Sequence, residues 1–416
     1  MRVVEPSEFK GLKQPKKQKR GGIRLRWIVF IVAILYVSTI TIRPTQIIAG
    51  KATVLAPTQT KAINIAWPKE GQAAIGAVGY GILDTHGDQK ALPTASVAKV
   101  MTALAVLKQH PLKVGDQGPM ITITQDDVDY YQKVVSEDGS NTPVALGEQI
   151  SEYQALQALL LPSSNNMAHT VAVWAYGSQE AYVTYVNNFA KSLGMNNAHF
   201  DDASGFSSKT VATAEDLARL AVNAMDNPVI AEIAAQPDAE IPVAGKIYNV
   251  NMLLGKSGIV GLKTGNTDQA GGCFMAAAER EIGGQKIIAI TVVMGSTTLG
   301  QALHDSVPLI TSVFDGFEAA TLVKAKQTVG SYSMPWGSKV DVQASKDVSG
   351  VVWSGSPTKA ELELKGIPEP KHTIPGQTQV GIARGTFGRN QVKVPVLTTQ
   401  QITPPNFLWR FKPRFL

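Results

Sequence analysis

The chain has 416 residues, of which 44% are hydrophobic and 17% are charged. This composition predicts folded domains with a sizeable apolar core and excludes a disordered polymer. The formal net charge is +6 at pH 7, but the excess of Lys and Arg lies in residues 1–26, so the charge does not indicate a nucleic-acid-binding surface. Because Cys273 is the single cysteine, no internal disulfide is possible.

The N-terminal segment combines positive charge with a long apolar run. After the basic residues, the chain from Trp27 to Ile42 contains no charged residue. Lysines and arginines before an apolar span hold the N-terminus in the cytoplasm. We therefore expect a basic cytoplasmic tail over residues 1–26 and a single-pass anchor in the cell membrane over residues 27–48, with the rest of the chain extracytoplasmic. The alternative, a cleaved signal peptide, has a shorter apolar region and a small-residue cleavage site.

The next segments change pattern twice. Residues 49–68 carry Pro and Thr without a stable period and predict a linker. The stretch "AAIGAVGYGILDTHGDQKALPT" contains two apolar runs separated by "DTHGDQ", which predicts a β-hairpin with its turn at these polar residues. In "PTASVAKVMTALAVL" the apolar residues recur at steps of three and four, which predicts a buried helix with Thr94 as its N-cap.

Residues 150–177 have the pattern of two consecutive helices. The apolar periodicity breaks near Pro162, where the first helix is expected to end. Ser151 and Gln154 form a capping-box pattern at the start of that first helix.

Further helices and strands complete this part of the chain. Residues 178–195 predict a helix that ends at Gly194, and residues 213–225 predict another with acidic residues in its first turn. Residues 258–295 look like two strands about a turn. Helices framed by strands from both ends indicate an α+β domain over residues 69–317.

The character of the sequence changes from about Lys324 onward. Short alternating segments such as "SKVDVQAS", "AELELKG" and "QVKVPVLT" stand between Gly and Pro turns and predict a small all-β domain over residues 318–403. Residues 404–416 form an aromatic and basic tail with two open interpretations. It is either a strand end packed on the β domain or a segment that lies on an anionic membrane surface.

Three short polar elements interrupt these patterns. Ser96 precedes Lys99 by three positions on a helix, which brings an amine close enough to take the proton of a hydroxyl. Ser164 and Asn166 supply a hydroxyl for a proton relay and an amide that can hold a peptide group. The stretch 263–265, Lys-Thr-Gly, offers a cation and a hydroxyl to a carboxylate at a strand. Each pattern is common by itself, but the ordered set predicts an acyl-transfer site.

The ordered set resembles the S-x-x-K, S-x-N and K-T-G motifs of penicillin-recognising serine enzymes. The stretches "PTASVAKVMTAL", "LGEQISEYQALQALLLPSSNNMA", "NNFAKSLGMNNAHFDDASGF" and "GIVGLKTGNTDQAGGCFMAAA" are similar to signatures of the D-alanyl-D-alanine carboxypeptidases, the low-molecular-mass penicillin-binding proteins. The resemblance covers about residues 70–315. It implies the β-lactamase/D,D-peptidase-like fold, in which an antiparallel sheet with flanking helices joins an all-helical lobe.

The resemblance also implies a function. Members of the family remove the terminal D-alanine from the stem pentapeptides of peptidoglycan, in cell-wall synthesis and the control of cell shape, and β-lactams acylate them. The expected partners are a stem peptide ending in D-Ala-D-Ala, β-lactams and the membrane, without nucleic acid. We expect no cofactor and no metal, because the sequence has no phosphate-binding loop or metal-ligand cluster.

Each candidate site residue takes its role from this resemblance. Ser96 is expected to be the acyl-ester nucleophile, Lys99 its general base and Ser164 the proton relay to the leaving D-alanine. Lys99 must be neutral to act as a base, and desolvation together with the cation of Lys263 lowers its pKa. The expected substrate-binding residues are Asn166, Lys263, Thr264 and Gly265, and the expected oxyanion hole is the backbone N–H of Ser96 and of Asn266.

The sequence departs from the family pattern at three places. Asn266 follows K-T-G, where relatives usually have an aromatic residue or His, but its role needs only the backbone N–H. The arginine that many relatives carry on the next strand corresponds to Ile288, with Lys286 on the same strand face as another candidate for the carboxylate. Met167 stands where the signature S-x-N-D-A has its acid, and we expect it to be a packing residue.

Three other functions use the same scaffold. A class A-like β-lactamase needs a glutamate that positions water after S-x-N, whereas "HFDDASGFSSK" offers Asp201 and Asp202. A D,D-endopeptidase would use the same residues on cross-linked peptides, and the sequence does not separate it from a carboxypeptidase. A non-catalytic cell-wall-binding protein is disfavoured, because all the acylation residues are present.

Overall fold

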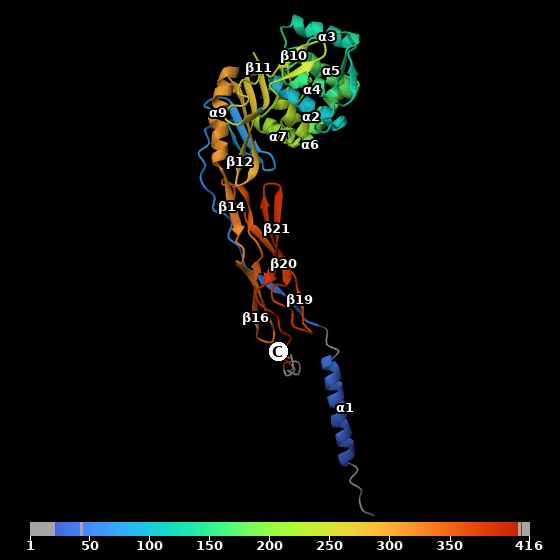
Figure 1. Ribbon diagram of the computed structural model, residues 1–416, viewed down its shortest axis with the longest axis vertical. Coiled ribbons are helices and arrows are strands. Elements are labelled where there is room, and N and C mark those ends of the chain that lie inside the picture. The colour runs from blue at the N-terminus through green and yellow to red at the C-terminus, as the bar shows by residue number, and fades with distance from the viewer. Residues whose placement is uncertain (1–20, 42–44, 407–408, 410–416) are drawn as a thin grey trace, which may run out of the picture.

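The computed structural model describes residues 21–41, 45–406 and 409. Figure 1 shows three parts along the long axis: helices beside a sheet at one end, a β-rich region in the middle and helix α1 (Gly21–Thr41) at the other end. Residues 1–20 of the predicted cytoplasmic tail and most of the predicted C-terminal tail lie outside the described residues. Within the described part of the chain, no helix is both long enough and apolar enough to cross a membrane.

A five-stranded antiparallel sheet forms the centre of the first part, in the order β11-β12-β13-β3-β4. Its strands are β3 (Gln72–Ala77), β4 (Gly81–His86), β11 (Ile259–Thr267), β12 (Gly271–Ile282) and β13 (Gln285–Ser296). Alternate residues of β12 enter two cores: Ala276 packs with helix α9 (Leu299–Asp315) on one face, and Ala277 packs with the helical lobe on the other. Burial on both faces explains why these strands read as continuous apolar runs.

The helical lobe covers the face of the sheet opposite α9 (Figure 1). Its helices are η2 (Ala95–Ala98), α2 (Lys99–Gln109), α3 (Gln125–Ser136), α4 (Glu152–Leu160), α5 (Asn165–Tyr176), α6 (Gln179–Ser192), α7 (Ala214–Asp226) and α8 (Pro228–Ala234). Three short strand pairs are formed by β5 (Leu92–Pro93), β6 (Met120–Thr122), β7 (Gln149–Ser151), β8 (Val211–Ala212), β9 (Asp238–Ile241) and β10 (Gly245–Tyr248).

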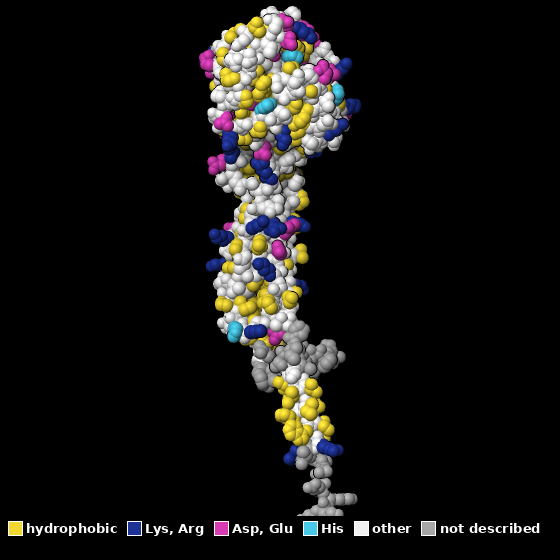
Figure 2. Space-filling view, turned by 90° about the vertical axis from the view of Figure 1, so that its right-hand side faces the viewer, with side chains coloured by type: hydrophobic (Ala, Val, Ile, Leu, Met, Phe, Trp, Pro, Cys, Tyr) yellow, Lys and Arg dark blue, Asp and Glu magenta, His cyan; other side chains and the backbone are white. Residues whose placement is uncertain are grey.

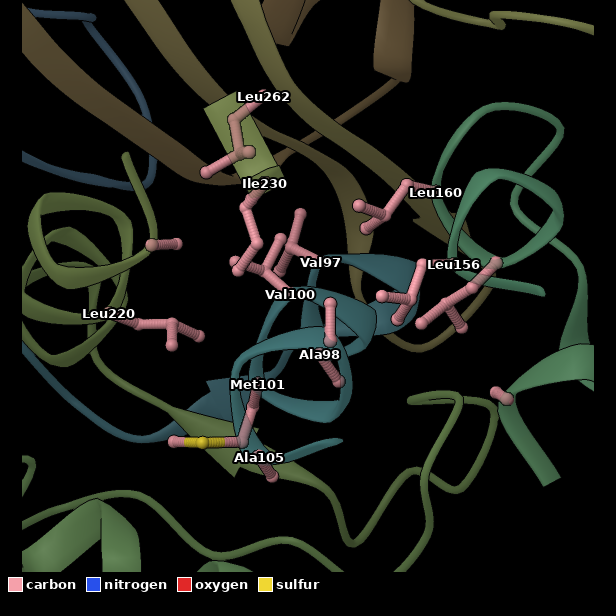
Figure 3. Packing of buried hydrophobic residues seen from close by; sticks show 14 of the residues in the cluster. Val97, Ala98, Val100, Met101, Ala105, Leu156, Leu160, Leu220, Ile230 and Leu262 are labelled. Atoms are coloured by element: carbon pink, nitrogen blue, oxygen red, sulfur yellow. The ribbon is translucent and has the colours of Figure 1, made fainter. Parts of the chain in front are cut away.

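Helix α2 lies at the centre of this lobe. Figure 3 shows Val100 of α2 beside Ile230 of α8, with Leu156 and Leu160 of α4 further to the right. Most of α2 is buried, including its polar residues Lys99 and Thr102. The apolar periodicity therefore correctly predicted a buried helix, and the burial extends to the lysine at its start.

The β-rich region consists of a six-stranded sheet in the order β18-β20-β21-β16-β15-β2, next to the pair β14–β17 and the pair β1–β19. Its strands are β1 (Ile47–Ile48), β2 (Gly50–Ala52), β14 (Phe317–Val323), β15 (Thr328–Ser333), β16 (Lys339–Ala344), β17 (Val348–Trp353), β18 (Ala360–Leu364), β19 (Ile367–Pro368), β20 (Gln379–Phe387) and β21 (Asn390–Thr398). The alternating pattern from about Lys324 corresponds to these strands, whose inward side chains form a core of their own.

The segment predicted as a linker is part of this β-rich region. Strand β1 pairs with β19, and β2 forms the edge of the six-stranded sheet beside β15. Further along, the Lys61 backbone N–H donates to the Ser354 carbonyl over 2.9 Å. The predicted end of the anchor at residue 48 and the predicted linker over residues 49–68 were therefore wrong. Strands this short carry no readable period and form because a partner edge accepts their backbone hydrogen bonds.

The first hairpin turns at a different place from the predicted one. The turn between β3 and β4 is Val78–Tyr80, and the predicted turn residues Asp84–His86 belong to β4 itself. Gly79 and Gly81 have φ values of +83° and +76°, which a glycine adopts without steric cost. The prediction was wrong because the two glycines lie inside an apolar run, whereas the polar stretch offered a more familiar turn composition.

Two further local predictions were inaccurate. Thr94 makes no side-chain capping bond, and the helix begins instead as the 3₁₀ turn η2. Residues 258–295 contain three strands or parts of them rather than two, because the apolar residues on both sides of the turn at 268–270 read as one continuous segment.

Other predictions about helix ends are confirmed. Helices α4 and α5 flank Pro162, and the capping box of Ser151 and Gln154 is present. Helix α6 ends just before Gly194. These signals were reliable because caps and breakers act through the residues next to them, without help from the rest of the fold.

Candidate active site

Ser96 and Lys99 lie together where η2 passes into α2. A 3₁₀ turn has three residues per turn, so side chains three positions apart are eclipsed. The Lys99 amine is 2.8 Å from the Ser96 hydroxyl. The hydroxyl is half-buried, whereas Lys99 is fully buried. The helix start thus holds a reachable hydroxyl in contact with an amine that water does not reach.

The surroundings of the Lys99 amine suit a neutral group. Besides Ser96, it contacts the side-chain oxygen of Asn165 at 2.7 Å and the Ser204 carbonyl at 3.1 Å. A neutral amine has two N–H groups for these two oxygens and one lone pair for the Ser96 hydroxyl. Burial lowers the pKa of Lys99 well below its usual range, and the nearby cation of Lys263 lowers it further.

The loop at 201–206 is shaped by the carboxylate of Asp202. This carboxylate accepts hydrogen bonds from the backbone N–H of Ser204, Gly205 and Phe206 and from the hydroxyls of Ser204 and Thr210. A Cβ atom on Gly205 would lie 1.9 Å from the Ala95 carbonyl oxygen, so only glycine fits there. The loop therefore packs tightly on η2 and presents the Ser204 carbonyl to Lys99.

The start of α5 contributes a different serine and asparagine from those predicted. Ser163 borders the cleft in front of Ser96, and Asn165 contacts the Lys99 amine. The predicted relay Ser164 is fully buried with its hydroxyl on the Thr142 hydroxyl. The predicted ligand Asn166 is also buried, with its side-chain amide bonded to the backbone of Thr142.

The S-x-N element is therefore the tripeptide Ser163-Ser164-Asn165, one position earlier than predicted. The sequence "SSNN" fits the pattern in two registers, and only the position of the first turn of α5 selects between them. In this register Asn166, not Met167, stands at the place of the acid in S-x-N-D-A. Met167 is a buried core residue.

Strand β11 forms the opposite wall. Lys263 is buried, and its amine donates to the Thr264 carbonyl over 3.1 Å. Burial lowers the pKa of Lys263 to about 7. A Cβ atom on Gly265 would lie 3.1 Å from the Ser96 backbone nitrogen, so the glycine lets the strand lie directly against the serine.

These walls enclose a cleft of about 200 Å³. It is lined by Ser96, Ser140, Pro162, Ser163, Val250, Thr264, Gly265, Asn266 and Leu299. Among the described residues, no group of three or more His, Cys, Asp or Glu side chains is placed to hold a metal ion. The arrangement offers a hydroxyl nucleophile, a buried amine base beside it and a second hydroxyl across the cleft.

A family model described as D-alanyl-D-alanine carboxypeptidase, Peptidase S11, matches residues 76–298. The chain belongs to this family. The D-alanyl-D-alanine carboxypeptidase DacC of Escherichia coli K12 is 28% identical over 352 residues, which cover 80% of this chain and 84% of that protein. A D-alanyl-D-alanine carboxypeptidase of Streptomyces sp. K15 is 30% identical, over 52% of this chain and 77% of its own length.

Solved structures of related proteins share the fold. The crystal structure of the Streptomyces K15 DD-transpeptidase covers 62% of this chain and 100% of its own, with a TM-score of 0.53 and 26% identity. The D-alanyl-D-alanine carboxypeptidase DacD of Francisella tularensis covers 83% of this chain and 97% of its own, with a TM-score of 0.54 and 21% identity. The predicted family, the enzyme class of serine D,D-carboxypeptidase and the β-lactamase/D,D-peptidase fold are thereby confirmed.

The substitutes considered for the carboxylate-binding arginine of this family lie away from the cleft. Lys286 and Ile288 border a different cavity, between the β3–β4 turn and Arg389 of the β-rich region. The Lys286 amine bonds to the Glu279 carboxylate over 2.9 Å. Strand β13 runs between the two sites, and the cleft is near its far end, where Ser296 leads into α9. The expectation that either residue takes the arginine's place was therefore wrong.

Four residues of the site were missed in the sequence. Ser163 and Asn165 were present in "SSNN", but the other register was chosen. Asp202 was considered only in the comparison with β-lactamases, where a glutamate that positions water was sought. The sequence Asp-Ala-Ser-Gly from Asp202 to Gly205 is, however, rich in turn-forming residues. Thr142 carries no signal of its own, because its contacts with α5 arise from tertiary packing.

Proposed function

We propose that this protein removes the terminal D-alanine from peptidoglycan stem pentapeptides ending in D-Ala-D-Ala, through an acyl-enzyme on Ser96, and that β-lactams acylate the same serine. The observation that carries this proposal is the contact between the Ser96 hydroxyl and the fully buried Lys99 amine. Burial and the Lys263 cation depress the pKa of Lys99 and leave it a base.

In acylation, Lys99 takes the proton of the Ser96 hydroxyl while the oxygen attacks the carbonyl carbon of the penultimate D-alanine. The negative charge that develops on the carbonyl oxygen faces the backbone N–H groups of Ser96 and Asn266. The bond from that carbon to the nitrogen of the last D-alanine then breaks. The proton returns from Lys99 to this nitrogen through the Ser163 hydroxyl, and free D-alanine leaves. Water subsequently hydrolyses the ester and regenerates Ser96.

Lys263 and Thr264 bind the carboxylate of the substrate. Thr264 borders the cleft, and the Lys263 amine lies directly behind it. An anion bound beside Lys263 favours its charged form and thus opposes the effect of burial. The side chain of Asn165, rather than Asn166, contacts Lys99 and orients its amine beside the cleft.

The membrane anchor is part of the proposal. Apolar side chains of α1 from Leu25 to Val37 are exposed, and Figure 2 shows them on the visible face of this helix. Arg24 and Arg26 stand at its beginning. Although the described helix does not by itself meet the length and apolarity needed to cross a membrane, exposed apolar residues behind a basic segment favour membrane association with the N-terminus in the cytoplasm. The catalytic part would then work on the extracytoplasmic side of the cell membrane.

The direct test is mass spectrometry of muropeptides incubated with the full-length protein in detergent. Loss of one D-alanine from pentapeptides is expected. Cleavage of cross-linked dimers instead would indicate a D,D-endopeptidase, a function that is named for a relative of Escherichia coli K12 with 30% identity over 48% of this chain.

A fluorescent penicillin gives the complementary measurement. The wild-type protein is expected to become labelled and Ser96→Ala to remain unlabelled, with a loss in acylation rate of at least about 10⁴-fold. Release of the label within seconds would contradict a carboxypeptidase and favour a β-lactamase. No labelling of the wild type would contradict catalysis altogether.

A further inference from the structure

Ser163 has an unusual backbone conformation at a functionally important place. Its φ is +68°, in the left-handed region that residues other than glycine rarely occupy. It nevertheless borders the cleft opposite Ser96. A conformation of this kind persists only where the surrounding structure imposes it, and such strain is concentrated at functional sites.

The contacts that impose this conformation come from the residues after Ser163. The Asn166 side chain accepts the Thr142 backbone N–H over 3.0 Å and donates to the Thr142 carbonyl over 2.9 Å. The Ser164 hydroxyl bonds to the Thr142 hydroxyl. The Asn165 backbone N–H donates to the Ser140 carbonyl over 2.7 Å. Four hydrogen bonds thus fix the start of α5 to the segment at 140–142.

These bonds are shielded from water. Thr142, Ser164 and Asn166 are each at most 1% exposed. We call these four hydrogen bonds the clamp. If the buried Asn166 amide lost its partners, it would still be removed from water and would no longer be compensated by hydrogen bonds, so the clamped arrangement is strongly favoured. Ser163 and Asn165, which alternate with the clamped residues along the chain, are thereby turned toward the cleft and Lys99.

We propose that Thr142 and Asn166 are positioning residues that hold Ser163 for proton transfer and Asn165 against Lys99. The clamp acts through the backbone, and neither residue reaches the reacting atoms. This inference rests on the proposed function, since it concerns the rate at which Ser96 is acylated. A displacement of about 1 Å at a catalytic group can reduce a rate by about 100-fold.

The molecule contains a matched clamp away from the cleft. The Asn187 side chain accepts the Phe200 backbone N–H over 3.0 Å and donates to the Phe200 carbonyl over 2.8 Å. Phe200 does not border the cleft. Asn187→Ala therefore removes a corresponding pair of hydrogen bonds, together with the bond from the Asn187 amide to the Val183 carbonyl, and leaves the contacts of Ser163 in place.

The experiment measures acylation of the full chain by a fluorescent penicillin, with the rate constant and the dissociation constant of the initial complex determined separately. Asn166→Ala is expected to lower the acylation rate constant of the folded protein by about 10-fold to 100-fold. The dissociation constant should change little, because Thr264 and Lys263 are untouched. Asn187→Ala should also lower the melting temperature but keep the wild-type rate constant.

A conservative variant provides the second readout. Asn166→Asp keeps an oxygen that accepts the Thr142 N–H, and its second oxygen, protonated in this buried place, donates to the Thr142 carbonyl, so it should recover part of the rate that Asn166→Ala loses. Equal rate constants for Asn166→Ala and the wild type would overturn the proposal, as would an equal loss in Asn187→Ala. If the wild type is itself not labelled, the proposed function fails, which is a distinct result.

Discussion

The catalytic lobe, which comprises the five-stranded sheet and the helices on its two faces, and the β-rich region bury different kinds of side chain. The lobe encloses two lysines, Lys99 and Lys263, together with many hydroxyl and amide groups. Among the described residues beyond Phe317, the buried polar side chains are Ser354 and Thr398, and the core is built from aliphatic and aromatic groups. Burying an amine costs desolvation free energy, whereas burying an apolar side chain does not. The comparison therefore separates a region built for chemistry from a region built for stability.

The two regions are nevertheless joined by specific contacts. The Tyr80 hydroxyl, in the β3–β4 turn, donates to the Val351 carbonyl over 2.9 Å. Arg389, at the tip of the β20–β21 hairpin, forms an ion pair with Asp226 at the end of α7. None of these contact residues lines the cleft, which makes separate tests of the two regions possible.

The largest expected effect on stability lies in the β-rich region. Phe387 is 1% exposed, and its ring lies against Gly350 and Gly385. Phe387→Ala should lower the free energy of unfolding by about 3–5 kcal/mol, because the cavity cannot be refilled by neighbouring glycines. Chemical denaturation would measure this loss. The penicillin acylation rate of the folded protein should remain at the wild-type value. A slower rate would contradict the proposal that the β-rich region contributes to stability and not to catalysis.

The two adjacent serines of the lobe provide the next comparison. Ser163→Ala removes the hydroxyl at the cleft and should reduce the turnover number for a D-Ala-D-Ala peptide by about 100-fold, the usual contribution of a positioned proton donor. Ser164→Ala removes only the bond to Thr142 and should cost less than about 10-fold. Steady-state kinetics of the two variants decides between the registers. A larger loss in Ser164→Ala would restore the register predicted from the sequence.

The pH dependence of kcat/KM tests the role of Lys263. Its pKa is lowered to about 7 in the free enzyme, and carboxylate binding requires the cation. Activity should therefore fall as the pH rises through about 7, since deprotonation removes the charge. The side chain of Lys99 has the opposite requirement, because it must lose its proton, so activity rises with pH through the depressed pKa of Lys99.

The variant Lys263→Arg separates the acid limb of the pH profile, where activity rises as Lys99 loses its proton, from the alkaline limb, where activity falls as Lys263 loses its proton. An arginine stays charged across the whole range, so the alkaline limb should move upward by more than about one pH unit while the acid limb remains. The profile of kcat/KM between pH 5 and pH 9 gives the measurement. An alkaline limb that stays in place would assign it to another group.

The smallest expected effect is at the junction of the two regions. The side chains of Arg389 and Asp226 are 56% and 45% exposed, and exposed ion pairs contribute less than about 1 kcal/mol because solvent screens them. Arg389→Ala should therefore change the melting temperature only slightly, and the change should shrink further in high salt. A large loss would indicate that this ion pair, rather than the strands around it, joins the regions.

Much of the fold could be predicted from local sequence signals. Capping residues such as Ser151, breakers such as Pro162 and the apolar period of α2 act over a few neighbouring residues, so they predicted helices without knowledge of the rest of the chain. The alternation in the C-terminal part predicted strands for the same reason. The short strands β1 and β2 were not predicted, because they exist only through their partners β19 and β15.

The candidate site shows the same division. The sequence by itself determined the chemistry: a serine and a lysine three positions apart, a later serine and asparagine, and a lysine and threonine on a strand. Only the tertiary structure decided which serine faces the cleft and which asparagine contacts Lys99, because the residues of each pair are chemically identical. The distinction arises from the Asn166 clamp on Thr142, a contact between residues 24 positions apart that no local pattern encodes.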